Sequence, residues 1–167
     1  MSNSLILYQS DILAHGRSPS NFRMMENATH ELQGDSPICG DHMTLYLKVG
    51  DNKVEDIAFH SDACCAVCKA SSSMMTEAIK HKSIADANTL ANSFLNMVND
   101  QALTPSETKR LNKLTVFGRI VEVPSRIECA ILSWTTLLYA IKVIHDDSKS
   151  NIAIEERYKH SLKVTAL

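Results

Sequence analysis

The chain has 167 residues, of which 44% are hydrophobic and 22% are charged, so one folded domain with a proper core is expected and wholesale disorder is excluded. The formal net charge is −2 and no basic block occurs, which argues against a nucleic-acid partner. No apolar run approaches the roughly 20 residues of a membrane span, so no membrane partner is expected either.

The first predicted element is a helix that ends near Gly16. Its apolar face is formed by Leu5, Leu7, Tyr8, Ile12 and Leu13. The same segment has no positively charged start and carries Asp11, which is not typical of a signal peptide. We therefore expect a cytoplasmic protein whose thiols stay reduced.

An extended surface segment follows the helix, with a short strand near Ala28–Leu32. Apolar and polar residues then alternate from Met43 to Val49, which predicts a half-buried strand. After a turn at 50–53, the segment from Val54 to His60 is the returning strand of a hairpin.

Four helices are predicted after the hairpin. The first begins near Asp62, where the apolar period becomes helical, and the second begins at a cap formed by Ser83 with Asp86. Residues Thr104–Glu107 form a capping box for a third helix, which carries Leu111, Leu114 and Phe117 and stops by Gly118.

A second capping box, Ser125–Glu128, opens the last predicted helix. Its apolar side has Ile127, Ile131, Trp134, Leu138 and Ile141. The order predicts an α+β fold, in which a small antiparallel sheet of about three strands packs against several helices. A single domain spans residues 1–167, with its core at about 5–146 and a polar tail at 147–167.

Five cysteines, an odd number, favour metal binding or thiol chemistry over a disulfide framework. Cys39 lies on a predicted turn with Gly40, next to Asp41. Cys65 and Cys129 fall at the starts of two predicted helices, where the helix dipole favours the thiolate.

Simpler interpretations exist for several of these thiols. Cys64 and Cys68 most simply fill the core as small hydrophobic residues, and a core role for Cys129 is equally compatible with its spacing. The Cys65–x–x–Cys68 spacing also occurs in redox motifs, but it lies next to a hairpin and lacks the usual aromatic and proline neighbours. The small residues and methionines of Ser71–Met75 are typical of a close-packed helix face.

Four segments resemble the iron–sulfur cluster assembly proteins of the IscU/NifU N-terminal-domain family, over about residues 7–138. The segments are "LYQSDILAHGRSPSNF", "SPICGD", "CAVCKASSSMMTE" and "PSRIECAILSWTTL". Within that family the chain is most similar to the SufU type. The interval from Cys65 to Cys129 is long, and Glu128 stands where IscU-type scaffolds have a histidine. The Leu-Pro-Pro-Val-Lys chaperone motif of IscU is absent.

The resemblance implies that Cys39, Asp41, Cys65 and Cys129 hold a metal. Three thiolates and one carboxylate suit tetrahedral Zn²⁺, with Arg126 offsetting part of the negative charge. It also implies that Cys39 leaves the metal and accepts persulfide sulfur from a SufS-like cysteine desulfurase. The protein would be at most a sulfurtransferase, and a downstream iron–sulfur scaffold or apo-protein clients would receive the sulfur.

Two alternatives stay open at this point. The same ligands suit a scaffold that assembles a 2Fe–2S cluster, or binds iron, and passes it to clients. The family's Gly-x-Gly-Cys approach to the second cysteine is replaced here by Asp62-Ala63-Cys64-Cys65. Counting back from Ser71–Glu77 selects Cys65 as the ligand, which we prefer, whereas counting on from Phe59 selects Cys64. Cys64 and Cys68 are therefore possible alternate ligands.

Overall fold

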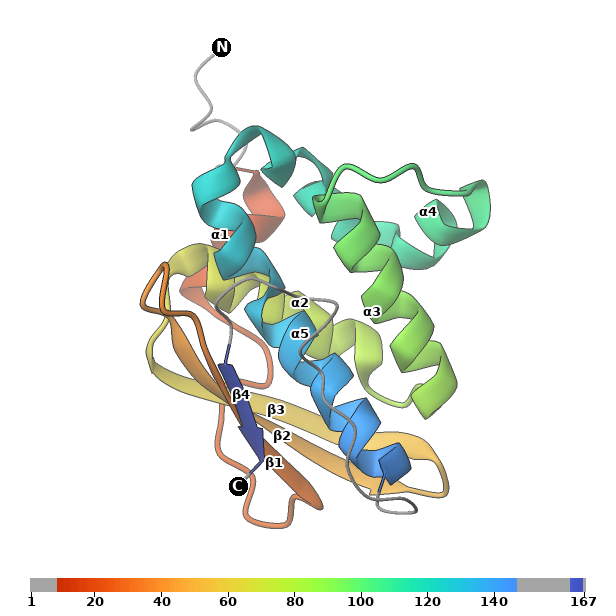
Figure 1. The fold of residues 1–167 in the computed structure, drawn as a ribbon. Coiled ribbons are helices and arrows are strands. Elements are labelled where there is room, and N and C mark those ends of the chain that lie inside the picture. Colours follow the sequence, from red (N-terminus) through yellow and green to blue (C-terminus); the bar gives the residue numbers. More distant parts are fainter. Residues whose placement is uncertain (1–8, 147–162, 167) are drawn as a thin grey trace.

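Figure 1 presents the computed structural model, which describes residues 9–146 and 163–166. The elements in chain order are α1 (Ser10–Arg17), β1 (His30–Asp35), β2 (His42–Gly50), β3 (Lys53–Ala63), α2 (Ala66–Ile79), α3 (Ile84–Val98), α4 (Pro105–Leu111), the 3₁₀ helix η2 (Asn112–Glu122), α5 (Pro124–Asp146) and β4 (Lys163–Ala166). The α+β class predicted from the sequence is confirmed. Three residues of the predicted first helix, Leu5, Leu7 and Tyr8, lie outside the described residues.

The strands form one antiparallel sheet in the order β3-β2-β1-β4. The predicted hairpin is confirmed, with Asp51 and Asn52 at φ 49° and 58° in its turn. The expected sheet of about three strands is confirmed in β1, β2 and β3, and the short β4, in the predicted polar tail, pairs with the edge of β1. A strand of four residues is too short to show an alternating pattern, so only pairing with β1 identifies it.

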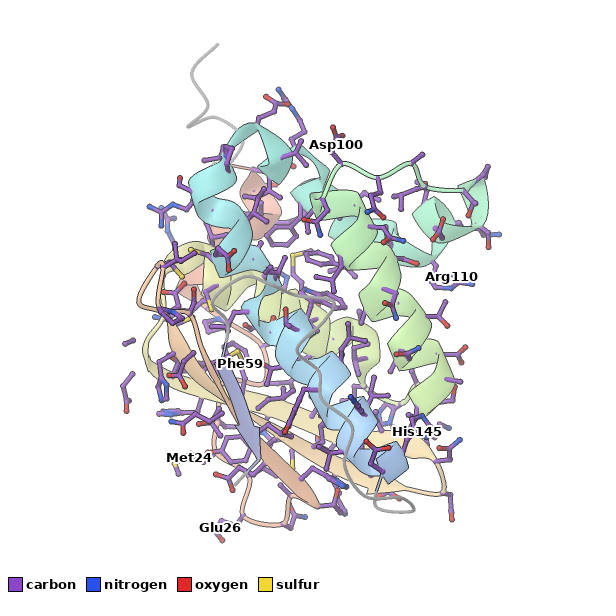
Figure 2. The ribbon with its side chains drawn as sticks, in the orientation of Figure 1. Met24, Glu26, Phe59, Asp100, Arg110 and His145 are labelled. Atoms are coloured by element: carbon purple, nitrogen blue, oxygen red, sulfur yellow. The ribbon has the colours of Figure 1, made fainter. Side chains whose placement is uncertain are left out.

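Helices α2 and α5 cover one face of the sheet, and α3 packs against α5 on the outside (Figure 1). The core between these layers contains Phe59, which Figure 2 places between the sheet and the helices and which is fully buried. Trp134 of α5 stacks on Phe94 of α3, with ring centroids 4.3 Å apart. Helix α5 is long and apolar enough to cross a membrane by composition, but 61% of the tested window is buried inside the protein, as in a core helix.

The opposite face of the sheet is covered by the extended segment that follows α1. Met25 packs there against Tyr46 and Ala58, while Met24 projects outward and is 67% exposed (Figure 2). Backbone hydrogen bonds join Asn21 and Arg23 to Phe59 of β3. The segment therefore adds to the sheet instead of forming a free loop.

Two of the predicted helix starts are confirmed by side-chain caps. The Ser83 hydroxyl accepts from the Asp86 amide, and Thr104 forms a complete capping box with Glu107. The predicted start of α2 near Asp62 is wrong, because β3 remains extended to Ala63 and the helix begins at Ala66.

The predicted capping box at Ser125 is also wrong. Helix α5 already begins at Pro124, and the Arg126 amide donates to the Val123 carbonyl, so Ser125 lies inside the first turn. Proline is favoured at the first position of a helix, where its missing N–H costs nothing. Pro124 therefore starts this helix two residues before Arg126, the first helical residue that the Ser-x-x-Glu pattern indicates.

The third predicted helix changes its geometry after Leu111. Asn112 has φ 49° and ends α4, and the chain continues as the 3₁₀ helix η2. The buried residues of this region recur at every third position, namely Leu111, Leu114, Phe117 and Ile120. A period of three matches the three residues per turn of a 3₁₀ helix, in which such side chains align on one face.

Candidate metal centre

A short loop between β1 and β2 carries Cys39 and Asp41. The Ser36 amide donates to the Asp41 carbonyl at 2.9 Å, and the Gly40 amide donates to the Ser36 carbonyl at 2.8 Å, so the loop is closed by its own backbone. Gly40 has φ 74°, which other residues adopt at a cost, and no other atom lies near the position of a Cβ there. The glycine is thus required by the turn, and the adjacent Cys39 is only half-buried.

Asp41 connects this loop to the start of α2. Its buried carboxylate accepts from the Cys39 thiol at 3.3 Å through Oδ2 and from the Cys65 amide at 2.9 Å through Oδ1. The contact follows from the hairpin register, in which His42 at the start of β2 pairs with Ala63 at the end of β3. The residues just outside the paired strands therefore meet.

Cys65 is the N-cap of α2 and not a residue of its first turn. Its backbone is extended (φ −69°, ψ 167°), and its sulfur accepts from the Cys68 amide at 3.4 Å. This is the position in which serine or aspartate usually satisfies a free helix amide. No residue from Asp62 to Cys65 has a positive φ, so the replacement of the family's glycines is accommodated by ordinary extended backbone.

Cys129 reaches the same place from the second turn of α5. It is 1% exposed, and its thiol lies within hydrogen-bond reach of both Cys65 and Cys39. The exposed guanidinium of Arg126, one turn earlier, lies with Nη1 4.0 Å from the Cys129 sulfur. The side chain of Arg126 therefore places a positive charge close to the Cys129 sulfur.

The pKa values of the neighbouring thiols Cys65 and Cys129 are shifted in opposite directions. A hydrogen bond from the Cys129 thiol lowers the pKa of Cys65 to about 7, against the opposing effect of burial. The same hydrogen bond, together with burial, raises the pKa of Cys129. Cys129 therefore holds its proton more tightly than Cys65, and Cys65 is the more readily ionised of the two thiols.

Three ligand atoms converge tightly enough to hold one metal ion. The sulfur of Cys39, a carboxylate oxygen of Asp41 and the sulfur of Cys129 all lie within 4.8 Å of one another. Cys65 borders this group through its hydrogen bonds with Asp41 and Cys129. Thiolates with a carboxylate are a donor set that Zn²⁺ accepts, so these residues fit the metal that the sequence indicates.

The two other cysteines lie beside this group. Cys68 is fully buried in α2, and the partly exposed Cys64 nearby, together with burial, raises the pKa of its thiol. The Cys64 thiol donates to the Cys65 carbonyl at 3.7 Å. All five cysteines of the chain are therefore gathered at one end of α2.

Ser71 fixes the two helices that carry Cys65 and Cys129. Its hydroxyl donates to the Ala130 carbonyl at 2.6 Å and accepts from the Trp134 indole at 3.0 Å. On the other side of α2, Ser73 is bonded to His15 and to the Ser20 amide, both at 2.7 Å. The serines predicted as close-packed filler are buried as expected, and they also hold α2 to α5 and to the α1 region.

One role of Asp41 is not indicated by the sequence. The family motif predicts it only as a ligand, but it also anchors the Cys65 amide, 24 residues away in the chain. That contact depends on the register of the β2–β3 hairpin, and the position of the turn between the two strands is the only sequence signal for it.

Comparison with known proteins places these residues in a recognised family. The chain matches the family described as NifU-like N-terminal domain over residues 7–99. It is 35% identical to the iron–sulfur cluster assembly scaffold protein IscU of Streptococcus pyogenes over 136 residues, covering 81% of this chain and 83% of that protein. It is 33% identical to the zinc-dependent sulfurtransferase SufU of Bacillus subtilis over 131 residues, covering 78% and 86% of the two chains.

A solved structure agrees with the same comparison. The SufU protein FiSufU from Fervidobacterium islandicum AW-1 superposes with a TM-score of 0.76 at 27% sequence identity. The match covers 83% of this chain and 98% of that one. The similarity thus extends over the sheet and the helices together.

Proposed function

The chain belongs to the NifU-like N-terminal domain family and is an iron–sulfur cluster assembly protein of the IscU, NifU and SufU type; we propose that it acts there as a zinc-bound acceptor of persulfide sulfur. The observation that supports this proposal is that the thiols lie on different kinds of structural element. Cys39 is on a short loop, whereas Cys65 and Cys129 are held by helices. The Cys39 thiol can therefore leave the metal to accept sulfur, while the thiols of Cys65 and Cys129 keep the metal bound.

The ligands would be Cys39, Asp41, Cys65 and Cys129. Zinc, when bound, keeps thiols deprotonated near neutral pH. Arg126 offsets part of the negative charge of the group from its place beside Cys129. Cys65 is favoured over Cys64 as the ligand, because its amide is bonded to Asp41 and the Cys129 thiol lowers its pKa, whereas the Cys64 thiol donates to the Cys65 carbonyl.

The sulfur step needs a nucleophile that can reach outward. The Cys39 thiolate attacks the terminal sulfur of a persulfide on a cysteine desulfurase, so that a new S–S bond forms on Cys39 and the desulfurase cysteine leaves as its thiolate. Asp41 accepts a hydrogen bond from the Cys39 thiol and is placed to hold its proton. A cytoplasmic location suits this chemistry, because reducing conditions keep these thiols free.

The proposal is tested with desulfurase turnover followed by intact mass under non-reducing conditions. Cys39→Ser is expected to abolish the mass gain of one sulfur atom and the stimulation of the desulfurase, with an unchanged circular dichroism spectrum. Ile38→Ser is the matched control, because it alters the same exposed loop and keeps every thiol. Sulfur that still loads onto the Cys39→Ser variant would show that another cysteine is the acceptor.

The second candidate function is a scaffold on which a 2Fe–2S cluster is assembled as cargo. It is favoured by the same convergence of Cys39, Asp41 and Cys129, since thiolates also hold iron–sulfur clusters. Metal analysis and an absorption spectrum of anaerobically purified protein separate the two functions. A colourless protein with one zinc supports sulfur transfer, and visible charge-transfer bands with bound iron support the scaffold.

A further inference from the structure

A cavity of about 360 Å³ lies between the end of α2, helix α3 and the α4–η2 region. Small-molecule sites in proteins have volumes of about 300–1,000 Å³, so this cavity is large enough for a compact ligand. Ala78 lines it near the end of α2, whereas Cys65 caps the start of that helix. At 1.5 Å per residue the two residues are about 20 Å apart along the helix, so the cavity is separate from the metal centre.

The bottom of the cavity is apolar. It is closed by four buried side chains from α2, α3, α4 and η2, namely Met74, Leu90, Leu111 and Leu114. Ala78 adds a half-buried methyl group. A ligand in the cavity would therefore lie on a small apolar surface.

The sides of the cavity are basic. Four cationic side chains from three segments line it, namely Lys80, Lys82, Arg110 and Lys113. The first two belong to the turn between α2 and α3, the third to the last turn of α4 (labelled in Figure 2) and the fourth to η2. The chain as a whole has a net charge of −2, so positive charge is concentrated at this place.

Two of the charged lining residues already have partners. The Glu77 carboxylate accepts from the Ser20 hydroxyl at 2.6 Å, which directs its negative charge to the segment after α1. Lys80 forms an ion pair with Asp56 at 3.1 Å. Neither residue therefore decides the charge that a ligand would meet.

The other three cations are available to a ligand. Lys82 and Lys113 form no ion pair in the part of the chain that the structure describes, and Arg110 has only the longer-range attraction of Glu107. Lys82 is half-buried, while Arg110 and Lys113 are exposed. An anion in the cavity would thus meet three cations that have no close acidic partner among the described residues.

Helix ends explain part of this pattern but not all of it. Cations are favourable in the last turn of a helix, where the dipole is negative, and α4 has both Lys109 and Arg110 there. The dipole does not explain why Arg110 lines the same cavity as Lys82 and Lys113, from two other segments, while Lys109 does not.

The size of the cavity favours a small molecule over a protein partner. Eleven of the described residues line it. A stable protein interface takes about 20–30 residues on each side, which is a much larger surface. Three cations also match the two negative charges of a phosphate monoester better than the single charge of a carboxylate.

We propose that this cavity binds a small organic phosphate, that is, a phosphate monoester with a compact apolar part. Lys82, Arg110 and Lys113 bind the phosphate by charge-assisted hydrogen bonds, and the apolar part contacts Ala78 and the apolar bottom. This binding site goes beyond the proposed sulfur transfer and does not depend on it.

The test is a titration of full-length, zinc-loaded protein with phenyl phosphate, followed by two-dimensional ¹H–¹⁵N NMR. Saturable shifts are expected at the amides of Ala78, Lys82 and Lys113. Inorganic phosphate, which lacks the apolar part, and benzoate, which has one charge, should each bind about fivefold more weakly or worse. Added salt should weaken the binding of phenyl phosphate, because two of the cations are exposed.

Matched charge removals identify the residues that bind. Lys82→Gln and Lys113→Gln should each weaken phenyl phosphate binding about threefold or more. Lys109→Gln is the control, because it removes the same charge from the last turn of α4 but lies outside the cavity, and it should bind as the wild type does. Lys113 is exposed, so its variant serves if Lys82→Gln fails to fold.

Three results would overturn the inference. The first is the absence of saturable shifts at the cavity amides. The second is equal weakening by Lys109→Gln and Lys113→Gln, which would mean that phosphate follows the general positive charge of the region. The third is a response of these amides to poly-L-glutamate but not to phenyl phosphate, which would assign this surface to an acidic protein partner.

Discussion

Asp41 and Cys129 are the two residues that tie the separate sulfur atoms together. The Asp41 carboxylate accepts hydrogen bonds from the Cys39 thiol and from the Cys65 amide. The Cys129 thiol lies next to both Cys39 and Cys65. Each is almost fully buried, so these contacts are made away from bulk water, where hydrogen bonds to charged groups are stronger. The charge state of the centre is therefore governed by a few local contacts.

The first prediction concerns the pH dependence of Cys65. Its pKa is lowered to about 7 by the hydrogen bond from Cys129, so metal-free protein should alkylate at Cys65 with a half-maximal rate near that pH. Because its thiolate is favoured in the folded protein, this stabilisation is complete above the unfolded pKa of Cys65 and is lost as the pH falls through about 7. The measurement is the iodoacetamide rate at each pH, with the site identified by peptide mass.

Removing the donor provides the control for that titration. Cys129→Ala should move the alkylation midpoint of Cys65 upward, toward the value of an ordinary thiol. A midpoint that stays near 7 in this variant would mean that the hydrogen bond from the Cys68 amide or the helix dipole, and not Cys129, lowers the pKa of Cys65.

Among the helices and strands, α2 and α5 decide how rigid the centre is. Cys65 caps α2 and Cys129 lies in the second turn of α5, and Ser71 bonds the two helices close to both. Cys39 itself lies on the loop between β1 and β2 and not on a helix, and the side chain of Asp41 joins that loop to the N-cap of α2. The difference supports sulfur exchange at Cys39.

The second prediction tests the connection between those helices. Ser71→Ala leaves the Trp134 indole and the Ala130 carbonyl without their partner in a fully buried place, which should lower the free energy of unfolding by about 1–3 kcal/mol. Denaturant unfolding followed by Trp134 fluorescence measures it. Ser72→Ala is the control, since the Ser72 hydroxyl is hydrogen-bonded to the sulfur of Met43, which is a weak acceptor. An equal loss of unfolding free energy in both variants would mean that the loss comes from packing and not from the hydrogen bonds of Ser71.

The third prediction concerns the start of α4. Thr104→Ala removes the hydroxyl that accepts from the Glu107 amide, while the amide of residue 104 can still donate to the Glu107 carboxylate, and we expect a loss of about 1 kcal/mol in the free energy of unfolding. Ser106→Ala, one residue inside the helix and also exposed, should change it little. Thermal unfolding measured by circular dichroism compares the two, and identical melting temperatures would show that the box contributes nothing to global stability.

At the scale of the whole molecule, three distant segments are brought to one point. The loop before β2, the start of α2 and the second turn of α5 supply Cys39 with Asp41, Cys65 and Cys129 respectively. A metal held there would bind the folded chain and not the unfolded one. Metal binding therefore adds to folding stability by mass action.

The fourth prediction follows from this linkage. Chelation should lower the melting temperature of the zinc-loaded protein, because it removes a ligand that binds only the folded chain. At a free concentration of a hundred times its Kd, such a ligand adds about 2.7 kcal/mol to the free energy of unfolding. Cys129→Ala should melt at a lower temperature and no longer respond to the chelator. Cys68→Ala should keep its response to the chelator, and a wild-type melting curve indifferent to chelation would mean that the centre does not hold the metal.

Local patterns in the sequence were sufficient for the β2–β3 hairpin, the caps at Ser83 and Thr104, and the apolar faces of the helices. Each depends on residues only a few positions apart, and the family motifs, which are equally short, single out Cys39, Asp41, Cys65 and Cys129. The exact helix starts were less predictable. At Cys65 the strand pairing of Ala63 with His42 keeps the chain extended, and at Pro124 a proline takes the first helical position.

Only the tertiary structure decided which thiols face each other. Cys64 and Cys65 are neighbours in sequence but differ in role, because the Cys64 thiol donates to a backbone carbonyl, whereas Cys65 is the N-cap of α2 and its sulfur accepts from the Cys68 amide. The strand β4 and the Asp41–Cys65 contact likewise depend on pairing with distant segments. Sequence periodicity reports the side of an element that is buried, whereas the partner of each side chain depends on strand register and helix packing across the whole chain.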